Sequence, residues 1–378
     1  MNSLPVSIRL NPFKFKDIQG APVPWNRWGR ILESRPVFTL DPLFHAGVYY
    51  VQDSSAMFPG HLFRRVLESF PGRTVLDLCA APGGKTTDLA ASLREKYGDD
   101  FLLVSNEVMK QRASVLCDNV AVWGDPNVVV TSVDPAAFAG MTGMFDIIVA
   151  DVPCSGEGMF RKDVKAEQQW SEETVELCAA RQKRILADVW PALTEGGILI
   201  YSTCTYNRKE NDDNLLWAAS ELGGEIIPPE DEFTQYGVVS TEAGNLLRAG
   251  DTLGEGQWAG MLRKTSGCGK GRCAGLDSLH PLRRRGVMKG CMKGRDFVPD
   301  ADYALSISFD RDGYPVADVD RGTALKFLHR DSLVLPDQPK GYNVIAYEGF
   351  PLGFVKNLGN RCNNLLPQRR RILMDINA

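Results

Sequence analysis

The stretch that decides the fold is Val75-Leu76-Asp77-Leu78-Cys79-Ala80-Ala81-Pro82-Gly83-Gly84-Lys85-Thr86-Thr87. Three of its first four residues are apolar, which predicts a short buried β-strand. The two glycines let the backbone turn tightly and approach a ligand, and the residues after them favour a helix. A strand, a glycine-containing loop and a helix in this order are typical of the nucleotide-binding part of a doubly wound α/β sheet.

The same alternation continues along the chain and predicts the architecture around this stretch. We expect strands at Val75–Leu78, Phe101–Ser105, Asn127–Thr131, Phe145–Ala150 and Gly197–Ser202. We expect helices at Lys85–Leu93, Lys110–Val120 and Glu172–Trp190. The pattern indicates an α/β core of the Rossmann-like type, a mostly parallel sheet with helices on both faces. After Asp302 a smaller α+β region is predicted, with strand-like runs at Ala304–Phe309, Tyr342–Tyr347 and Leu352–Val355.

A chain of 378 residues is long enough for two or three domains. We divide it into a lead-in (residues 1–55), the α/β core (56–265), a basic flexible linker (266–300) and a C-terminal domain (301–378). The linker is expected because that region is rich in Gly, Arg, Lys and Cys and shows little periodicity.

The composition argues against a secreted, a membrane-spanning or a disulfide-rich protein. The N-terminus lacks the apolar core of a signal peptide, and no apolar run has the length of a membrane span. Nine cysteines, an odd number scattered along the chain, are unlike a disulfide framework. We therefore expect a cytoplasmic, monomeric protein with reduced thiols and no membrane contact. A net charge of −4 does not by itself indicate nucleic-acid binding, so local basic clusters have to be considered.

The loop after the first strand predicts a nucleoside cofactor. Gly84-Lys85-Thr86 resembles the end of a P-loop, but Cys79 stands where that motif needs a glycine. Asp77, Glu107 and Asp134 follow or end successive strands, where acids bind ribose hydroxyls or an adenine amino group. An adenosine ligand without phosphates, S-adenosylmethionine, suits this set. The bland alternative makes Asp77 a strand-end cap and Glu107 a solvated residue. The expected cofactor-binding residues are Cys79, Ala80, Ala81, Pro82, Gly83, Gly84, Lys85, Glu107, Arg112, Asp134 and Asp151.

Two thiols predict the chemistry. Cys154, in Asp151-Val152-Pro153-Cys154-Ser155-Gly156, and Cys204, in Tyr201-Ser202-Thr203-Cys204-Thr205-Tyr206, each follow an expected strand. Chemistry collects at the carboxyl ends of such strands. A thiolate is a strong nucleophile, and a carboxylate lies beside Cys154 in the sequence, so the pattern favours covalent catalysis. The spacing leaves open which cysteine attacks.

These blocks carry a resemblance to a known family. Asp151–Asp163, Ser202–Tyr206 and the loop Leu76–Thr87 resemble the Sun-type RNA cytosine-5 methyltransferases, and most of all the bacterial RsmF branch, which modifies small-subunit ribosomal RNA. Ser7–Pro12 and Tyr49–Ser55 are similar to that branch as well. Gly349–Asn364 resembles its C-terminal RNA-binding region. The branch usually has further sequence before Ser7–Pro12, so we expect a shortened or trimmed start.

The resemblance implies S-adenosylmethionine-dependent methylation of carbon 5 of a cytidine in small-subunit ribosomal RNA. It implies that Cys204 is the nucleophile and that Cys154 assists release of the product. Asp151 is suited to act as an acid or hydrogen-bond partner at ring nitrogen 3, and Lys162 to steer the phosphate or base unless it is a plain surface lysine. The alternatives are a transfer-RNA methyltransferase, a non-catalytic RNA-binding assembly factor and a P-loop ATPase.

Basic clusters are the expected RNA contacts. The candidates are Arg369–Arg371, Lys356 with Arg361, and Arg283–Arg285. Cys268, Cys273, His280 and Cys291 could suggest a zinc site, but they lack a tight Cys-x-x-Cys pair. We expect a basic linker there and no metal.

Overall fold

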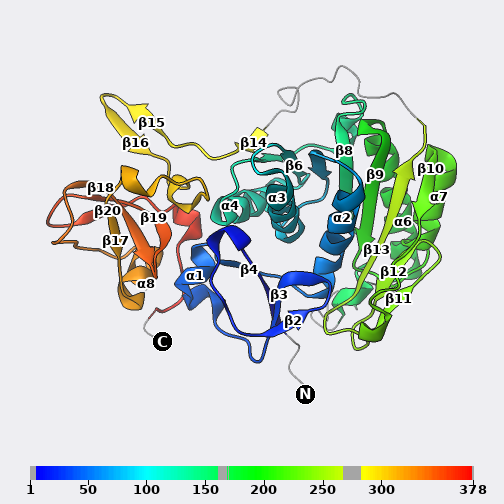
Figure 1. Ribbon diagram of the computed structural model, residues 1–378, viewed down its shortest axis with the longest axis horizontal. Coiled ribbons are helices and arrows are strands. Elements are labelled where there is room, and N and C mark those ends of the chain that lie inside the picture. Colours follow the sequence, from blue (N-terminus) through cyan, green and yellow to red (C-terminus); the bar gives the residue numbers. More distant parts are fainter. Residues whose placement is uncertain (1–5, 161–167, 169, 267–281, 377–378) are drawn as a thin grey trace.

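A large mixed sheet forms the centre of the computed structural model, which describes residues 6–160, 168, 170–266 and 282–376 (Figure 1). Its parallel part is β5 (Thr74–Asp77), β6 (Leu102–Asn106), β7 (Val128–Thr131), β8 (Phe145–Asp151) and β9 (Leu193–Thr203). These strands lie in the order β9-β8-β5-β6-β7. From β5 the chain adds strands β6 and β7 on one side, and then β8 and β9 on the other side. The point between β5 and β8 is therefore the topological switch point, where such sheets bind ligands.

Helices cover both faces of this sheet, as the sequence predicts. The helices α2 (Phe58–Ser69), α3 (Gly84–Tyr97) and α4 (Lys110–Trp123) pack on one face. The helices α6 (Glu172–Val189) and α7 (Asp212–Leu222) pack on the other. Neighbouring residues Val75 and Leu76 belong to the two different cores, because successive side chains of a strand point to opposite faces. Burial on both faces explains why the strands are almost continuously apolar.

Antiparallel strands extend both edges of the parallel sheet. Beside β9 lies β13 (Gln257–Lys264), and next to it are β12 (Gly244–Leu247) and β11 (Val238–Ser240), while β10 (Gly224–Ile227) also pairs with β13. At the other edge β14 (Leu282–Arg285) pairs with β7.

Part of the region expected to be a linker is regular structure. Besides β14, it contains a hairpin of β15 (Gly290–Lys293) and β16 (Asp296–Pro299). In β14 the half-buried Leu282 and Arg284 alternate with the exposed Arg283 and Arg285. The expectation of a linker is wrong for these residues. A strand is recognised in a sequence by alternating apolar and polar residues, and a run of arginines does not show that alternation. Residues 267–281 lie outside the described part of the chain.

The strand expected at Ala304–Phe309 is also wrong. Residues Tyr303–Leu305 form a 3₁₀ turn, and irregular backbone follows. The Ser306 hydroxyl accepts a hydrogen bond from the Ser308 N–H at 3.1 Å, and the two hydroxyls lie 2.8 Å apart. Such local side-chain bonds compete with a strand ladder. The strands expected around residues 342–347 and 352–355 are confirmed.

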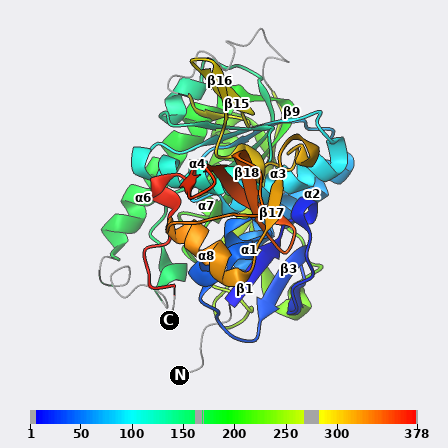
Figure 2. The ribbon, with the colours of Figure 1, turned by 90° about the vertical axis from the view of Figure 1, so that its left-hand side faces the viewer.

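The two ends of the chain form neighbouring units. The N-terminal sheet has the order β2-β3-β1-β4, and the C-terminal sheet has the order β17-β18-β19-β20 (Figures 1 and 2). The N-terminal elements are β1 (Val6–Leu10), β2 (Ala21–Val23), β3 (Asn26–Leu32), α1 (Pro42–His45) and β4 (Tyr49–Val51). The C-terminal elements are β17 (Val316–Asp318), α8 (Arg321–His329), β18 (Gly341–Tyr347), β19 (Phe350–Asn357) and β20 (Cys362–Asn364).

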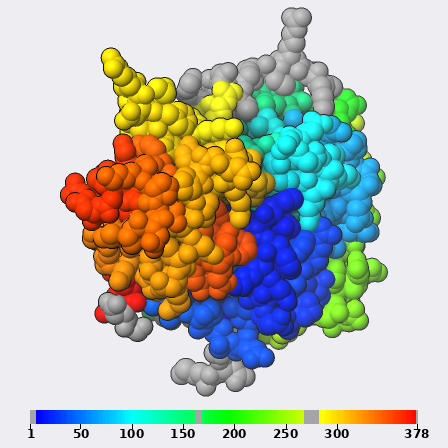
Figure 3. Space-filling model, turned by 60° about the vertical axis from the view of Figure 1, so that its left-hand side comes forward, coloured from blue at the N-terminus to red at the C-terminus, as the bar shows by residue number. Residues whose placement is uncertain are grey.

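A single hydrophobic core joins these two units. Ile8 and Leu43 from the N-terminal unit and Phe327 and Val355 from the C-terminal domain belong to one buried cluster. Figure 3 shows the two units in contact along their surface. In the described residues, no helix combines the length and apolarity needed to cross a membrane.

Short 3₁₀ helices connect the larger elements. They are η1 (Pro12–Lys14), η2 (Phe38–Leu40), η3 (Ser55–Met57), η4 (Pro135–Phe138), η5 (Glu157–Met159), η6 (Trp190–Ala192), η7 (Thr234–Tyr236), η9 (Tyr303–Leu305), η10 (Arg311–Gly313) and η11 (Gln368–Arg370).

Candidate active site

The two predicted cysteines meet beside the switch point. Strands β8 and β9 are parallel neighbours, and the last residue pair in their register is Asp151 with Ser202. The chain then carries Cys154 and Cys204 off the same edge of the sheet, so that their Sγ atoms lie 3.2 Å apart. Both thiols are free and partly buried. The sequence predicted each cysteine at a strand end, and the pairing of the strands brings the two together.

Their contact makes the two thiols unequal. A hydrogen bond from the Cys154 thiol lowers the pKa of Cys204, which burial alone would raise. The same hydrogen bond, together with burial, raises the pKa of Cys154 well above its ordinary value. Cys204 is therefore the thiol that ionises first, and the Cys154 S–H donates a hydrogen bond to the Cys204 thiolate. Because the thiolate is the reactive form of cysteine, the geometry favours Cys204 as the nucleophile.

Asp151 is fixed beside the thiols by three donors. Its Oδ2 accepts a hydrogen bond from Lys85 Nζ at 2.8 Å. Its Oδ1 accepts from Ser202 Oγ at 2.8 Å and from Gln257 Nε2 at 3.3 Å. Burial lowers the pKa of Lys85, but the charge and hydrogen bond of Asp151 outweigh it and raise that pKa. Lys85, expected to bind the cofactor, is thus a cation held on Asp151, and its charge also favours the Cys204 thiolate.

A buried glutamate connects the two cysteine loops. Glu210 Oε2 accepts hydrogen bonds from the Ser155 N–H at 3.0 Å and from Gln182 Nε2 at 2.8 Å. The Ser155 hydroxyl lies 3.1 Å from the hydroxyl of Thr205. Glu210 is completely buried, and burial raises its pKa. The sequence did not indicate this residue, because Glu210 stands in a charged run that is typical of a surface turn.

A cavity of about 480 Å³ opens over the cysteines. It runs from the loop after β5 past the ends of β6 and β8 to helix α6. Its lining residues are Leu78, Cys79, Ala81, Asn106, Glu107, Val108, Met109, Arg112, Asp134, Pro135, Asp151, Val152, Pro153, Cys154, Arg181, Arg184, Ile185 and Cys204. The volume lies within the range of about 300–1,000 Å³ that is usual for small-molecule sites.

The cavity contains about half of the predicted cofactor residues. Cys79, Ala81, Glu107, Arg112, Asp134 and Asp151 line it, whereas Ala80, Pro82, Gly83, Gly84 and Lys85 do not. Asp77 does not line it either: its Oδ2 accepts a hydrogen bond from Thr86 Oγ1 at 2.6 Å, and burial raises its pKa to about 7. Asp77 therefore fits the alternative of a strand-end cap. Arg181, Arg184 and Ile185 were missed because α6 lies far along the chain from the glycine loop.

The acids in the cavity fit an adenosine-type ligand. Glu107 is only 3% exposed; its Oε1 accepts a hydrogen bond from the Met109 N–H at 2.9 Å, and its Oε2 lies 3.2 Å from Arg112 Nη1. A carboxylate held in this way at the end of β6 is the acceptor that ribose hydroxyls need. Asp134, after β7, caps η4 through the Ala136 N–H and stays half exposed. The alternative interpretation of Glu107 as a solvated residue is wrong, because its side chain is buried.

Several predicted residues cannot be placed at the site. Lys162, Cys268, Cys273 and His280 lie outside the described residues, and Cys291 is exposed on β15. Three arginines of the predicted RNA clusters contact the protein's own acids instead. Arg284 Nη1 lies 2.6 Å from Asp302, Arg370 also binds Asp302, and Arg369 Nε lies 2.7 Å from Asp118. Arg283, Arg285, Arg361 and Arg371 remain exposed.

A mainly parallel sheet with a ligand cavity at its switch point and acids at successive strand ends defines a methyltransferase-like α/β protein. The structure of a methyltransferase homolog protein from Pyrococcus horikoshii superimposes with a TM-score of 0.56 at 26% identity, over 70% of this chain and 87% of that one. The crystal structure of NSun6 from Pyrococcus horikoshii with SFG gives a TM-score of 0.51 at 25% identity, over 61% of this chain and 57% of that one.

The sequence comparisons identify the family. Residues 64–219 match the family 16S rRNA methyltransferase RsmB/F, residues 314–372 match the methyltransferase RsmF PUA domain, and residues 1–54 match the N-terminal domain of 16S rRNA methyltransferase RsmF. The ribosomal RNA small subunit methyltransferase F of Shewanella loihica is 30% identical over 96% of this chain and 88% of its own length. The chain therefore belongs to the RsmF family.

Other relatives match over a smaller part of their length. The ribosomal RNA small subunit methyltransferase F of Pectobacterium atrosepticum is 35% identical over 71% of this chain and 54% of its own length. That of an Escherichia coli O157:H7 strain is 36% identical over 65% of this chain and 51% of its own length. The chain thus spans about half the length of these relatives.

Proposed function

We propose that this protein methylates carbon 5 of a cytidine in small-subunit ribosomal RNA, with S-adenosylmethionine as methyl donor and a covalent cysteine adduct as intermediate. The observation that carries the proposal is the pair of thiols, Cys154 and Cys204, which lie 3.2 Å apart in the lining of the cavity of about 480 Å³. A protein that only binds RNA has no use for a thiol with a lowered pKa that is hydrogen-bonded to a second thiol. Family membership supports RNA of the small subunit as the substrate, and a ribosomal substrate agrees with a cytoplasmic protein.

The reaction needs a nucleophile because carbon 5 of cytosine reacts poorly with an alkyl sulfonium. Addition of the Cys204 thiolate to carbon 6 turns the ring into an enamine, whose carbon 5 is nucleophilic. S-adenosylmethionine, when bound, supplies an electrophilic methyl group. Lys85 and Ser202 hold the Asp151 carboxyl group by hydrogen bonds. In this mechanism a proton held between that carboxyl group and ring nitrogen 3 draws electrons away from carbon 6.

Release of the product reverses the first step. Solvent water accepts the proton from carbon 5, the electrons of that carbon–hydrogen bond form the carbon 5–carbon 6 double bond, and the carbon–sulfur bond breaks with its electrons going to the Cys204 sulfur. The Cys154 thiol, which already donates to Cys204, stabilises the departing thiolate. The target base has to leave its stack to reach the thiols, because they lie in a cavity.

Covalent capture tests this proposal. RNA that contains 5-fluorocytidine cannot lose a proton from carbon 5, so with S-adenosylmethionine the enzyme should remain attached through denaturing electrophoresis. We expect the adduct with the unmodified protein, with Cys154→Ala and with the control Cys362→Ala, and no adduct with Cys204→Ala. An adduct that survives in Cys204→Ala but not in Cys154→Ala would reverse the cysteine roles. The absence of any adduct on both ribosomal and transfer RNA would contradict the proposed reaction.

A further inference from the structure

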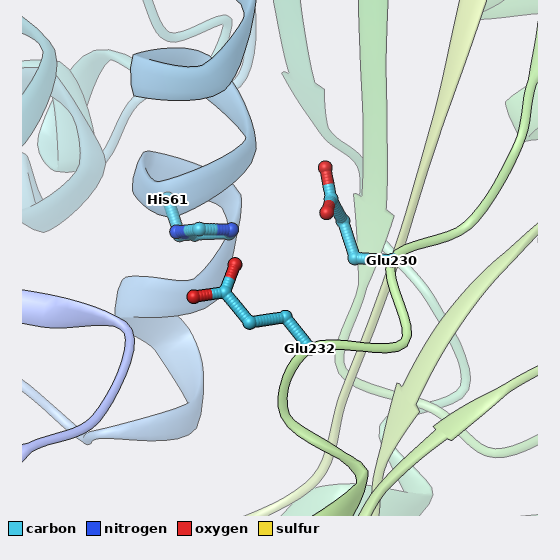
Figure 4. A group of neighbouring side chains, drawn as sticks. All are labelled: His61, Glu230 and Glu232. Atoms are coloured by element: carbon cyan, nitrogen blue, oxygen red, sulfur yellow. The ribbon is translucent and has the colours of Figure 1, made fainter.

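Three potential metal ligands meet outside the catalytic cavity. His61 lies on α2, and Glu230 and Glu232 lie in the loop between β10 and η7 (Figure 4). One ligand atom from each side chain can be chosen so that all three lie within 4.8 Å of one another. The side chains come from two segments that are far apart in the sequence, so the group cannot be recognised from the spacing of a sequence motif.

The imidazole is buried with an unused nitrogen. His61 is 8% exposed, and its Nε2 has no hydrogen-bond partner among the residues that the structure describes. Phe233 and Phe58 hold the ring, with ring centroids 4.9 Å and 5.6 Å from that of His61. Figure 4 shows the ring directed toward the two carboxyl groups. A buried nitrogen without a partner costs about 1–3 kcal/mol, and a bound ion would remove that cost.

The two carboxylates of this group lie near arginines that also pair with other acids. Arg64 and Arg65 follow on the same helix, but Arg64 Nη1 lies 2.9 Å from Asp88 Oδ1 and Arg65 Nη1 lies 2.9 Å from Glu68 Oε2. Each arginine therefore has an acidic partner outside the group, although Asp88 also lies 3.9 Å from Arg9. Among the described residues, Glu230 has one ion pair with an arginine, to Arg65 Nε at 3.6 Å. Glu230 and Glu232 together therefore match the charge of a divalent cation.

We propose that His61, Glu230 and Glu232 bind a zinc ion that fastens the loop after β10 to helix α2. One imidazole nitrogen and two carboxylate oxygens suit zinc, and water would complete the tetrahedron. Magnesium and calcium prefer oxygen ligands only. The carboxylates have to move inward to reach the metal–ligand distance of about 2.0–2.2 Å, and the exposed Glu232 is free to do so. A neighbouring cavity of about 460 Å³, lined by His61 and Glu232, gives the ion a route in.

Zinc titration of the full-length chain tests the proposal without reference to RNA or methylation. The protein is first stripped with a chelator. Cys268, Cys273 and Cys291 are replaced by serine in every sample, so that they cannot contribute a second site. Calorimetry with zinc chloride alone should show one bound ion per chain. His61→Asn and Glu232→Gln should each weaken binding at least tenfold, whereas the control His329→Asn should leave it unchanged.

Several results would overturn the proposal. They are no zinc binding in the serine background, equal zinc affinity in His61→Asn, or equal heats with magnesium and zinc. Far-UV circular dichroism of each variant shows whether it is folded. Because Glu232 is exposed, Glu232→Gln keeps the test valid even if replacement of the buried His61 disturbs the helix.

Discussion

At the scale of single residues, the proposed reaction depends on which of two neighbouring thiols gives up its proton. The hydrogen bond across 3.2 Å lowers the pKa of Cys204 and raises the pKa of Cys154. The negative charge of Asp151 raises the pKa of Cys204, and the positive charge of Lys85 lowers it. The ionisation of Cys204 thus depends on the pair of thiols and on the charges beside it.

This dependence predicts a change in pH profile. Cys154→Ala removes the donor that lowers the pKa of Cys204, so that pKa should rise, and less thiolate should be present at neutral pH. Alkylation of Cys204 by iodoacetamide, followed by mass spectrometry, should shift to higher pH and be a few-fold to about tenfold slower at pH 7. The control Cys362→Ala should not move the profile. An unchanged profile in Cys154→Ala would show that the hydrogen bond does not set the pKa.

Arg9 shows how a residue of the N-terminal sheet supports the cofactor loop. It is 1% exposed, its Nη2 donates to the Gly84 carbonyl at 3.0 Å, and its Nε donates to Gln52 Oε1 at 2.9 Å. The guanidinium also lies over the Trp123 ring, 4.6 Å from the ring centroid. Ser7–Pro12 and Tyr49–Ser55, two blocks of the family resemblance, are therefore connected to the start of α3 by one buried cation.

At the scale of elements, β14 and the C-terminal domain are joined by ions. Asp302, which is mostly buried, contacts Arg284 of β14 and Arg370 of η11. Burial alone would raise the pKa of Asp302, but the two arginines hold it below its ordinary value. A carboxyl group with a lowered pKa stabilises the fold above its unfolded pKa, about 3.9, and loses that effect as the pH falls through the folded value.

Asp302→Asn should therefore lower the free energy of unfolding by about 3 kcal/mol at pH 7, because it leaves two arginines beside a neutral amide. The difference from the unmodified protein should shrink as the pH falls below about 4. Urea denaturation at several pH values measures this difference. The exposed control Asp296→Asn should change stability by less than about 0.5 kcal/mol. A difference that stays constant with pH would contradict the role of the charge.

These elements show what the sequence can and cannot predict. The closeness of Cys154 and Cys204 is predictable, because the carboxyl ends of β8 and β9 leave the same edge of the sheet. The burial of Glu210 is not predictable, because its partners Ser155 and Gln182 are far from it in the sequence. The half-buried position of Arg284 is also not predictable from the sequence. Only its contact with Asp302 distinguishes it from the exposed Arg283 and Arg285.

At the scale of the whole molecule, we expect RNA binding to come from cations that are exposed on the surface. Successive side chains of β14 point to opposite sides, so that Arg283 and Arg285 are exposed and Arg284 contacts Asp302. We expect Arg283→Ala with Arg285→Ala to weaken RNA binding similarly for all sequences. The slope of log affinity against log salt should fall by about 0.7 for each lost phosphate contact.

Fluorescence anisotropy with labelled RNA at several salt concentrations measures that slope. The matched control is Arg27→Ala, a surface arginine that pairs with Glu95 on α3. An identical slope in the β14 double variant would place the RNA elsewhere on the surface.

The core that joins the two ends of the chain has a consequence for how the protein is made. Domains usually fold in order as they leave the ribosome, the N-terminal one first. Here Ile8 and Leu43 are buried against Phe327 and Val355, which are synthesised some three hundred residues later. The side of the N-terminal sheet that carries Ile8 must therefore wait for these later residues before it is buried. Until they are made, its apolar surface stays open to contacts with other chains.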